Sequence, residues 1–283
     1  MTDLLRSTVA LAVLVLAGCG APIDEPDPDP EPTPEPPLAC DDITSEYVDN
    51  EAPDAPPWSG TIFTSPAILT EDDPTTYGGR VYDGVGTRTT YDRREAAWVE
   101  TEVHLFTATF DDQEVEVRVN TEFTLEEAEE HGDTYLPAIG RLPPLLLVDV
   151  DTVTIHGGDE PFGGGNRDLL IHTLQGDRYI ADGILEETFA HEAAHTSLDG
   201  HHAATPEWIA AQEADGGFIS DYAEEWPQRE DVAESVVPYL AYRLRPEAYA
   251  GFELTAVADA IPNRVTYFDC LDLSFPATVS GDE

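Results

Sequence analysis

The sequence predicts an α+β fold, in which a strand-rich first half precedes a mostly helical second half. Apolar and polar residues alternate over 103–119, as they do in a β-hairpin with one buried face. A helix-start pattern follows at Thr124, and helical patterns dominate from about residue 182 onward. The chain has 283 residues. Without its atypical ends, roughly 240 residues remain, enough for one large domain or two small ones with a real core.

The elements of the first half are expected in the following order. Residues 41–95 are rich in Pro and Gly, which predicts short strands and loops. The two hairpin strands lie within 103–110 and 115–119. Thr124-Leu125-Glu126-Glu127 is a capping box, and it predicts a helix that ends near Ile139.

The middle of the chain is expected to complete a sheet. Pro143-Pro144 ends the preceding helix, and the apolar, β-branched run over 145–155 predicts a buried strand. A short strand is expected over 168–173. The glycines at 163–165 lack the Lys-Ser/Thr ending of a phosphate loop, so they indicate a flexible loop between strands.

The second half is expected to be helical. Asp182 can cap a helix whose first turn carries Glu186 and Glu187, where negative charge is favourable to the helix dipole. That helix is expected to run to about Ser197. Further helical stretches are expected over 206–216, 228–245 and about 246–260, followed by an extended tail that contains Cys270.

The charge balance excludes one class of partner. The chain has 13 basic residues, all of them Arg, against 58 acidic ones, and its formal net charge is −45. Nucleic acid is therefore not an expected partner, because phosphate binding needs a basic patch. With 41% hydrophobic residues the chain is nevertheless expected to fold rather than to be a disordered acidic protein.

Residues 1–18 have the features of an export signal. An apolar run from Val9 to Ala17 follows Arg6 and is too short to span a bilayer. The run ends in Leu16-Ala17-Gly18-Cys19, which resembles the lipobox of bacterial lipoproteins. The resemblance implies cleavage before Cys19, lipidation of Cys19 and a membrane anchor in the cell envelope. Because Gly20 rather than Asp follows Cys19, the outer membrane or the cell surface is the expected location.

The folded domain is expected to span 40–283, behind a tether. Residues 19–39 hold the lipidated Cys and a Pro/Asp/Glu-rich stretch that cannot bury a core. Cys40 and Cys270 bracket the domain and are the only other cysteines. In an exported protein we expect these two cysteines to form a disulfide.

The motif that carries chemistry is His191-Glu192-Ala193-Ala194-His195, an HExxH sequence on a predicted helix. Residues four apart share one helix face, so both imidazoles can bind the same zinc ion. Glu192 lies one residue further along, where it can reach a water molecule on that metal. Because zinc lowers the pKa of bound water towards ~7, a carboxylate can act as the general base.

This motif resembles that of the zincin metallopeptidases. The resemblance implies a twisted, mainly antiparallel sheet with a packed helix, then the HExxH helix, then a helical C-terminal lobe. It also implies one catalytic zinc ion in a cleft between the lobes and a peptide or protein substrate. In that family the substrate lies extended against an edge strand and bonds to it through its backbone.

A catalytic zinc site needs a third protein ligand, and two candidates compete. His201 lies six residues after His195, a spacing similar to that of the metzincins. However, Leu198 stands where metzincins have Gly, and the only Met is Met1, so a Met-turn is absent. Glu230 is the other candidate. It lies behind a Ser-x-Tyr-Ala segment in an arrangement that resembles the gluzincins, apart from Val232 in place of Phe, and it is the ligand we expect.

The gluzincin resemblance assigns two further roles. Glu234, one turn beyond Glu230, would orient a ligating histidine. Tyr222 would donate a hydrogen bond to the oxyanion of a tetrahedral intermediate. The polar residues just after the zinc helix are expected to be ordinary loop groups; they are Asp199, His201 and His202. Four other histidines are expected to be structural; they are His104, His131, His156 and His172.

The expected function is therefore that of a zinc-dependent endopeptidase tethered to the cell surface as a lipoprotein. Glu192 would take a proton from water and later deliver it to the leaving amine. One alternative is a non-catalytic surface lipoprotein that binds metal, such as a binding or adhesion module. A narrower alternative is a zinc amidase that acts on cell-wall peptide.

Overall fold

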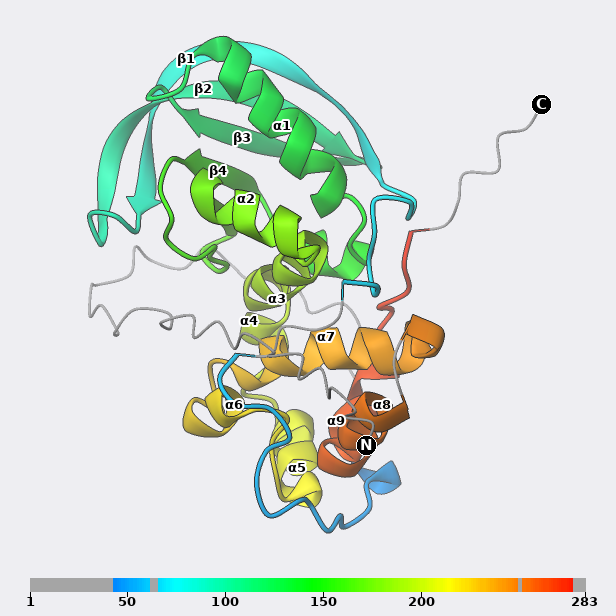
Figure 1. The fold of residues 1–283 in the computed structure, drawn as a ribbon. Coiled ribbons are helices and arrows are strands. Elements are labelled where there is room, and N and C mark those ends of the chain that lie inside the picture. The colour runs from blue at the N-terminus through cyan, green and yellow to red at the C-terminus, as the bar shows by residue number, and fades with distance from the viewer. Residues whose placement is uncertain (1–42, 62–65, 249–250, 277–283) are drawn as a thin grey trace, which may run out of the picture.

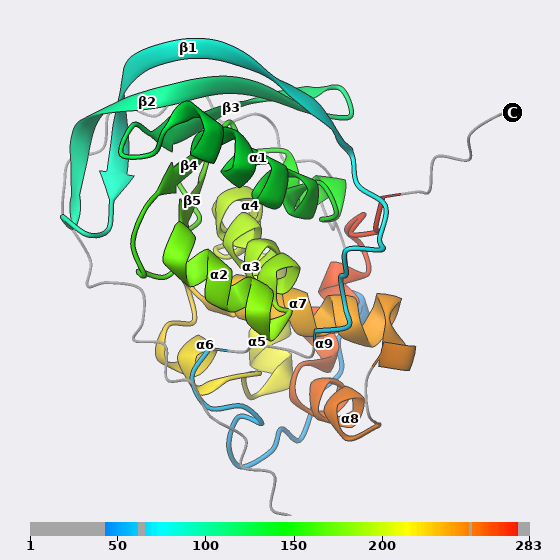
Figure 2. The same cartoon turned by 45° about the horizontal axis from the view of Figure 1, so that its top comes forward.

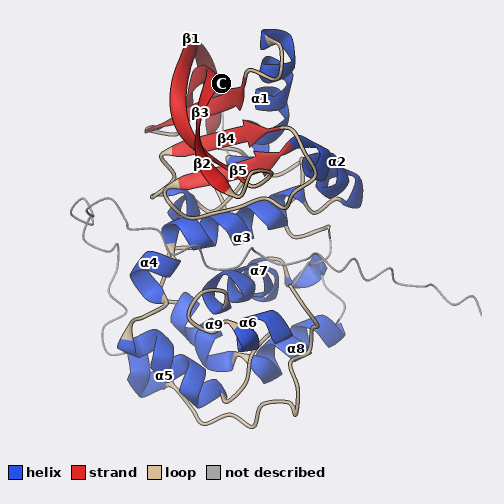
Figure 3. Ribbon diagram, turned by 90° about the vertical axis from the view of Figure 1, so that its left-hand side faces the viewer, coloured by secondary structure: helices blue, strands red, loops and turns tan. Residues whose placement is uncertain are grey.

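The computed structural model describes residues 43–61, 66–248 and 251–276. Within them a five-stranded sheet and two helices form an upper layer, and a group of helices forms the lower part of the molecule (Figures 1 and 3). The helix α3 (Leu185–Ser197) lies between these two parts, which Figure 3 shows from the side. The architecture is a mixed arrangement of helices and sheet, compatible with the α+β class.

The sheet has the strand order β1-β2-β3-β4-β5. The first two pairings are antiparallel and the last two, which are much shorter, are parallel, so the sheet is mixed. Parallel pairing arises because a helical crossover follows β3 and a long loop follows β4. The strands are β1 (Tyr77–Asp92), β2 (Ala97–Phe110), β3 (Gln113–Asn120), β4 (Thr152–His156) and β5 (Asp168–His172).

Helices α1 and α2 cover one face of the sheet, and both Figure 1 and Figure 2 show them there. The predicted capping box of α1 is present, since the Thr124 side chain accepts from Glu127 N–H and the Glu127 side chain accepts from Thr124 N–H. Below α3 lies the second group of helices. The remaining helices are α1 (Leu125–Ile139), α2 (Thr173–Asp182), α4 (Asp199–His202), α5 (Pro206–Asp215), α6 (Asp221–Glu225), α7 (Asp231–Leu244), α8 (Gly251–Ala260) and α9 (Pro262–Phe268).

Several sequence expectations need correction in the first half. The span 41–95 contains β1, a strand of 16 residues, where only short strands were expected. The apolar run over 145–155 is not one strand, because Pro144–Leu147 forms a 3₁₀ turn and β4 begins only at Thr152. Short apolar runs fit a buried turn as well as a buried strand, so their composition alone does not separate the two.

Two further corrections concern helix ends. Asp182 is the last residue of α2 rather than the cap of α3, and Gly183 ends α2 in the left-handed conformation with φ 69°. The predicted extended tail contains the helix α9 before Cys270. Helices at 125–139, 206–215 and 231–244 were predicted correctly within a few residues.

A continuous apolar core runs from the sheet through α3 into the helical part. The small residues Ala190, Ala193 and Ala194 are fully buried, and they let neighbouring elements approach α3 closely. Packing on several sides fixes the orientation of this helix, and with it the side chains of the HExxH sequence. Among the described residues, no helix combines the length and the apolar character that crossing a bilayer requires.

Candidate metal centre

The helix α3 presents His191 and His195 on one face, as their spacing predicts. Both rings are largely buried, and their ring centroids lie 4.8 Å apart. Nε2 of His195 lies 3.2 Å from Nε2 of His191. Two imidazole nitrogens from successive turns of one helix therefore converge on one point.

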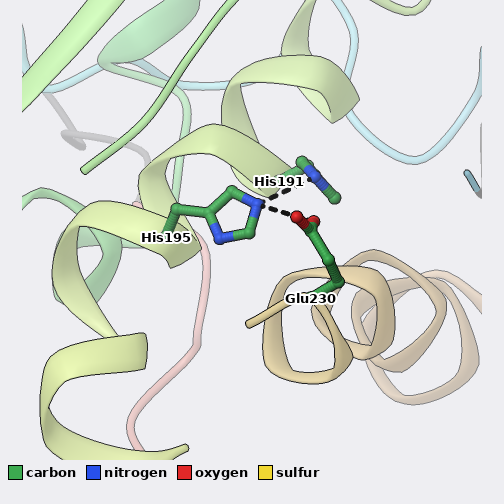
Figure 4. Close-up of side chains that lie close together, drawn as sticks. All are labelled: His191, His195 and Glu230. Atoms are coloured by element: carbon green, nitrogen blue, oxygen red, sulfur yellow. Dashed lines mark hydrogen bonds and ion pairs between the residues drawn. The ribbon is translucent and has the colours of Figure 1, made fainter. Parts of the chain in front are cut away.

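The third member of the group comes from the start of α7. Glu230 is the N-cap residue directly before α7, and its side chain is 1% exposed. Its Oε2 atom lies 3.2 Å from His195 Nε2 (Figure 4). Potential ligand atoms of His191, His195 and Glu230 all lie within 4.8 Å of one another. The structure thus brings together the three residues that the sequence analysis selected.

The geometry of this group fits a tetrahedral metal ion. Ligands about 2.1 Å from a tetrahedral centre lie about 3.4 Å from each other, and His195 Nε2 lies 3.2 Å from both His191 Nε2 and Glu230 Oε2. Glu230 Oε2 is buried and makes no hydrogen bond to any described residue. An uncompensated buried carboxylate oxygen is costly, and a cation at this point would satisfy it. Two imidazoles and one carboxylate are a ligand set that zinc accepts, with a fourth position left for water or substrate.

The other nitrogen of His195 is held by a carboxylate that the sequence analysis had treated as an ordinary loop group. His195 Nδ1 lies 2.7 Å from Asp199 Oδ2, one turn along the chain. A carboxylate on the far nitrogen fixes the ring orientation and directs the nitrogen lone pair at the metal position. The i, i+4 spacing from His195 to Asp199 was the available signal, because α3 is followed directly by the helical turn α4.

Glu234 faces the other histidine, though less closely. Its Oε1 atom lies 3.7 Å from His191 Nδ1, beyond hydrogen-bond length, and its side chain is fully buried. Ser220 donates a hydrogen bond of 2.7 Å to the other carboxylate oxygen, Oε2. Glu234 therefore stands behind His191, in the position expected of a residue that orients this ring.

The competing ligand His201 points elsewhere. Its Nε2 lies 2.6 Å from Asp149 Oδ2, and it is not part of the converging group. Leu198 adopts a right-handed conformation with φ −114°, so the chain continues into α4 without the sharp turn that a glycine allows. His202 is turned to Tyr267, with 2.7 Å between its Nδ1 and the phenol oxygen.

Tyr222 is linked to the centre through an arginine. Arg229 donates a hydrogen bond of 2.8 Å from Nε to Glu230 Oε1 and one of 3.2 Å to the Tyr222 hydroxyl. Arg229 thus holds one oxygen of the Glu230 carboxylate, and the other oxygen faces the histidines. The assignment of Tyr222 as an oxyanion donor stays a prediction.

Glu192 is buried and lies next to the glycine segment 163–165. Gly164 approaches the Glu192 backbone so closely that a Cβ atom at Gly164 would collide with the Glu192 carbonyl group. Gly163 forms an antiparallel bridge to Leu170 in β5, with hydrogen bonds of 3.0 and 2.8 Å. The expected flexible loop is therefore a packed segment that extends the sheet edge toward Glu192.

The titratable groups of the centre are shifted in opposite directions. Burial raises the pKa of Glu192, although the charges of His195 and Arg93 oppose this rise. Burial also disfavours ionised Glu230, yet the contact with His195 outweighs it and brings its pKa to about 2. Burial lowers the pKa of His191 to about 3. Burial opposes ionisation of His195, but its contacts with Asp199 and Glu230 outweigh this and raise its pKa. Glu230 is thus an anion and His191 a neutral ring, the forms in which both bind metal, whereas His195 has to lose a proton when a metal binds.

The remaining site predictions concern cysteines. Cys270 is disulfide-bonded. Its expected partner, Cys40, lies outside the described residues. The predicted signal peptide, the expected lipidation site Cys19 and the tether lie outside them as well.

Comparisons with known proteins add no relative. No protein-family model, no curated protein and no solved structure matches the chain. The residues and their geometry therefore carry the functional argument.

Proposed function

We propose that this protein is a zinc-dependent peptidase that cleaves peptide bonds within its substrates. The observation that carries the proposal is the convergence of His191, His195 and Glu230, with the buried carboxyl of Glu192 one residue from the first ligand. A purely structural metal site needs ligands but no general base. The presence of Glu192 therefore favours an enzyme over a non-catalytic metal-binding module.

Bound zinc would supply Lewis-acid polarisation of the scissile carbonyl and would lower the pKa of water in its open position. The residues of the chain perform the proton transfers. Glu192 accepts a proton from the attacking water and donates it to the leaving amine. Its raised pKa suits both steps, because a base that must later act as an acid works best with a pKa closer to neutrality. Tyr222 is proposed to donate a hydrogen bond to the oxyanion.

The proposed fold family is that of the zincins, in the gluzincin arrangement. It is supported by the order of a sheet with a packed helix, then α3, then a helical part that supplies Glu230 from α7. The extended substrate would lie along the sheet edge formed by β5 and the segment at Gly163, since this edge is adjacent to α3.

The decisive experiment compares Glu192→Gln with the wild-type chain. The variant keeps all three proposed ligands, so it should bind zinc with unchanged stoichiometry and lose about 10²–10⁴-fold in kcat. Glu213→Gln, an exposed change on α5, is the matched control and should retain full activity. A chelator should abolish peptide cleavage and added zinc should restore it. Unchanged turnover in Glu192→Gln would remove Glu192 as the base.

The proposed location is the cell envelope, where a lipid on Cys19 would anchor the domain through an acidic, Pro-rich tether. Mass spectrometry of the mature N-terminus tests this part independently of the enzyme activity. A diacylated or triacylated Cys19 supports the anchor, and an unmodified Cys19 or a cut elsewhere refutes it.

A further inference from the structure

Arg93 differs from every other arginine that the structure describes. Each of the others lies within ion-pair distance of at least one carboxylate, as expected in a chain with 58 acidic residues. Arg93 makes no side-chain hydrogen bond or ion pair with any described residue, although its side chain is half-buried. A guanidinium group without an anion in so acidic a protein is unusual, and it points to an anion from outside the chain.

The turn that carries Arg93 is firmly anchored. Arg93 follows the last residue of β1, and its carbonyl accepts a hydrogen bond of 3.2 Å from Ala96 N–H across the β1–β2 turn. The next residue, Arg94, binds the carboxylates of Asp92 and Glu122. Arg94 occupies both of these carboxylates, and neither of them forms an ion pair with Arg93.

The guanidinium of Arg93 lies beside the proposed substrate edge. A Cβ atom at Gly163 would lie only 2.7 Å from one of its terminal nitrogens, so the group rests against the glycine backbone. The following glycine, Gly164, packs against the backbone of Glu192. The positive charge of Arg93 therefore lies against Gly163, and the next glycine contacts Glu192, the proposed general base. This charge lowers the pKa of Glu192, against the effect of burial.

No neighbouring group among the described residues forms an ion pair with the positive charge of Arg93. The buried His172 lies close enough to interact with Arg93, but burial lowers the pKa of His172 to about 4, so its ring is neutral at pH 7. The carboxyl of Glu192 feels the charge of Arg93 but forms no ion pair with it, and Glu230 is already engaged by Arg229 and His195. The segment 161–165 itself contains no titratable residue.

We propose that Arg93 selects substrates by binding a carboxylate of the peptide next to the scissile bond. This inference rests on the proposed peptidase function and assigns it a substrate class, peptides with an acidic side chain or a free C-terminus at that subsite. Arginine suits the task because its planar fork can donate two parallel hydrogen bonds to one carboxylate. The absence of a side chain at Gly163 lets the guanidinium rest directly against the backbone of this edge.

The overall charge of −45 acts against acidic substrates at long range, whereas Arg93 acts at contact distance. At physiological ionic strength, salt screens the repulsion between exposed charges more than about 8 Å apart, but it screens a buried contact much less. Cleavage of an acidic peptide should therefore become faster, in kcat/KM, as salt rises from low to physiological concentration. Cleavage of a basic peptide should become slower.

The test begins with the zinc-loaded wild-type chain and a proteome-derived peptide library, with cleavage sites determined by mass spectrometry. We expect Asp and Glu to be enriched at one fixed position beside the cleaved bond if a side chain is bound. Cleavage at a fixed distance from the C-terminus, lost in C-terminal amides, would identify the terminal carboxylate instead. A selected acidic peptide and its Gln or amide twin are then compared in kinetics.

In Arg93→Gln, kcat/KM for the acidic peptide should fall by about 10–100-fold, with less than about 3-fold change for the uncharged twin. Arg93→Glu should reverse the preference toward a Lys-containing twin. The matched control is Arg88→Gln, which removes a positive charge from β1, the strand that leads into the turn of Arg93; Arg88 is paired with Glu116. This control should leave the acidic preference intact.

The outcomes separate the two proposals. Cleavage without acidic preference, or a preference that Arg93→Gln leaves unchanged, overturns the role of Arg93 while the peptidase function stands. If the zinc-loaded chain cleaves no peptide in the library, the proposed function fails, and the substrate class fails with it.

Discussion

Two adjacent acids at the start of α7 enter two different buried clusters. Glu230 faces the histidines of α3, and Asp231 faces Arg264 of α9. Arg264 donates hydrogen bonds of 2.8 Å to Asp231 and 2.9 Å to Asp215, and all three side chains are fully buried. The second cluster thus contains its own cation, whereas the first leaves Glu230 Oε2 without a hydrogen bond from any described residue.

The difference separates a structural cluster from a binding centre. Backbone N–H groups of Asn263 and Arg264 and the side chain of Gln212 add hydrogen bonds to the two carboxylates of the Arg264 cluster. Asp231 Oδ1 and Arg264 Nη2 make no hydrogen bond to a described residue, but both carboxylates are already ion-paired with the same arginine. In the histidine cluster, nitrogen and oxygen lone pairs converge on one point, an arrangement that a positive ion stabilises. Burial of charge alone therefore does not mark a functional site, whereas lone pairs of metal-binding atoms that converge on one point do.

The largest expected effect is on the structural cluster. Arg264→Met leaves Asp215 and Asp231 buried without a cation, and it should lower the free energy of unfolding by about 3–5 kcal/mol. Arg243→Met is the control, since Arg243 pairs with Asp269 near the surface and should cost about 1 kcal/mol or less. Urea denaturation in the presence of a chelator measures both. Equal losses in the two variants would contradict the distinction.

Glu230→Gln should act on metal binding instead of on folding. Residues that only orient ligands already contribute about 10–100-fold to metal affinity, so loss of a ligand should weaken zinc binding by at least about 100-fold. Competition with a chromophoric chelator measures the affinity. His201→Gln should leave zinc binding nearly unchanged, because His201 is paired with Asp149. The opposite result for these two variants would move the site to the metzincin arrangement.

Asp199→Asn should have a smaller effect on the same measurement. It weakens the hold on His195 Nδ1 without removing a ligand, and zinc affinity should fall by about 10–100-fold. Glu234→Gln should have a weaker effect, because the distance from Glu234 to His191 exceeds hydrogen-bond length. An effect of Asp199→Asn no larger than that of Glu213→Gln would show that Asp199 does not orient the ring.

The smallest expected effect is a change in stability caused by Glu187. This buried acid forms no ion pair with an arginine or a histidine among the described residues. Burial raises its pKa to about 8, while its Oε1 accepts hydrogen bonds from the N–H groups of Ile68 and Leu69. The pKa of Glu187 is higher in the folded chain than in the unfolded chain. Its protonated carboxyl group therefore contributes fully to stability below about pH 4, and this contribution is lost as pH rises to about 8. Glu187→Gln should therefore gain stability relative to wild type at high pH.

We expect a gain of about 1–2 kcal/mol at pH 8.5 and none at pH 4, since one pKa unit corresponds to about 1.4 kcal/mol and relaxation relieves part of the penalty. Thermal or urea unfolding across this pH range measures the difference. A constant difference between variant and wild type at all pH values would mean that Glu187 is not protonated in the folded chain.

Local patterns explain which features could be predicted from the sequence. The i, i+4 spacing of His191 and His195 and the capping box at Thr124 depend on neighbours within one helical turn, so the residues alone indicate them. Glu230 was selected by resemblance, and the structure places it beside the histidines. The apolar run at 145–155 failed as a guide, since such runs occur equally in buried turns.

Long-range contacts explain what the sequence could not indicate. Arg93 meets Gly163 across 70 positions, and no pattern near either residue reveals the contact. The same holds for Asp149, which engages His201 from 52 positions away. The role of Asp199 was within reach of helical spacing, but it required knowing that α4 continues directly from α3.

The origin of the metal ligands on α3 and α7 has a consequence for how long the protein survives in its surroundings. An ion held by both helices joins the sheet-bearing part to the helical part, so metal availability and folding are linked by mass action. Free zinc at 100 times its dissociation constant would add about 2.7 kcal/mol to the stability of the folded chain. In a zinc-poor environment that increment would disappear, and the unfolded chain would become more open to attack by proteases.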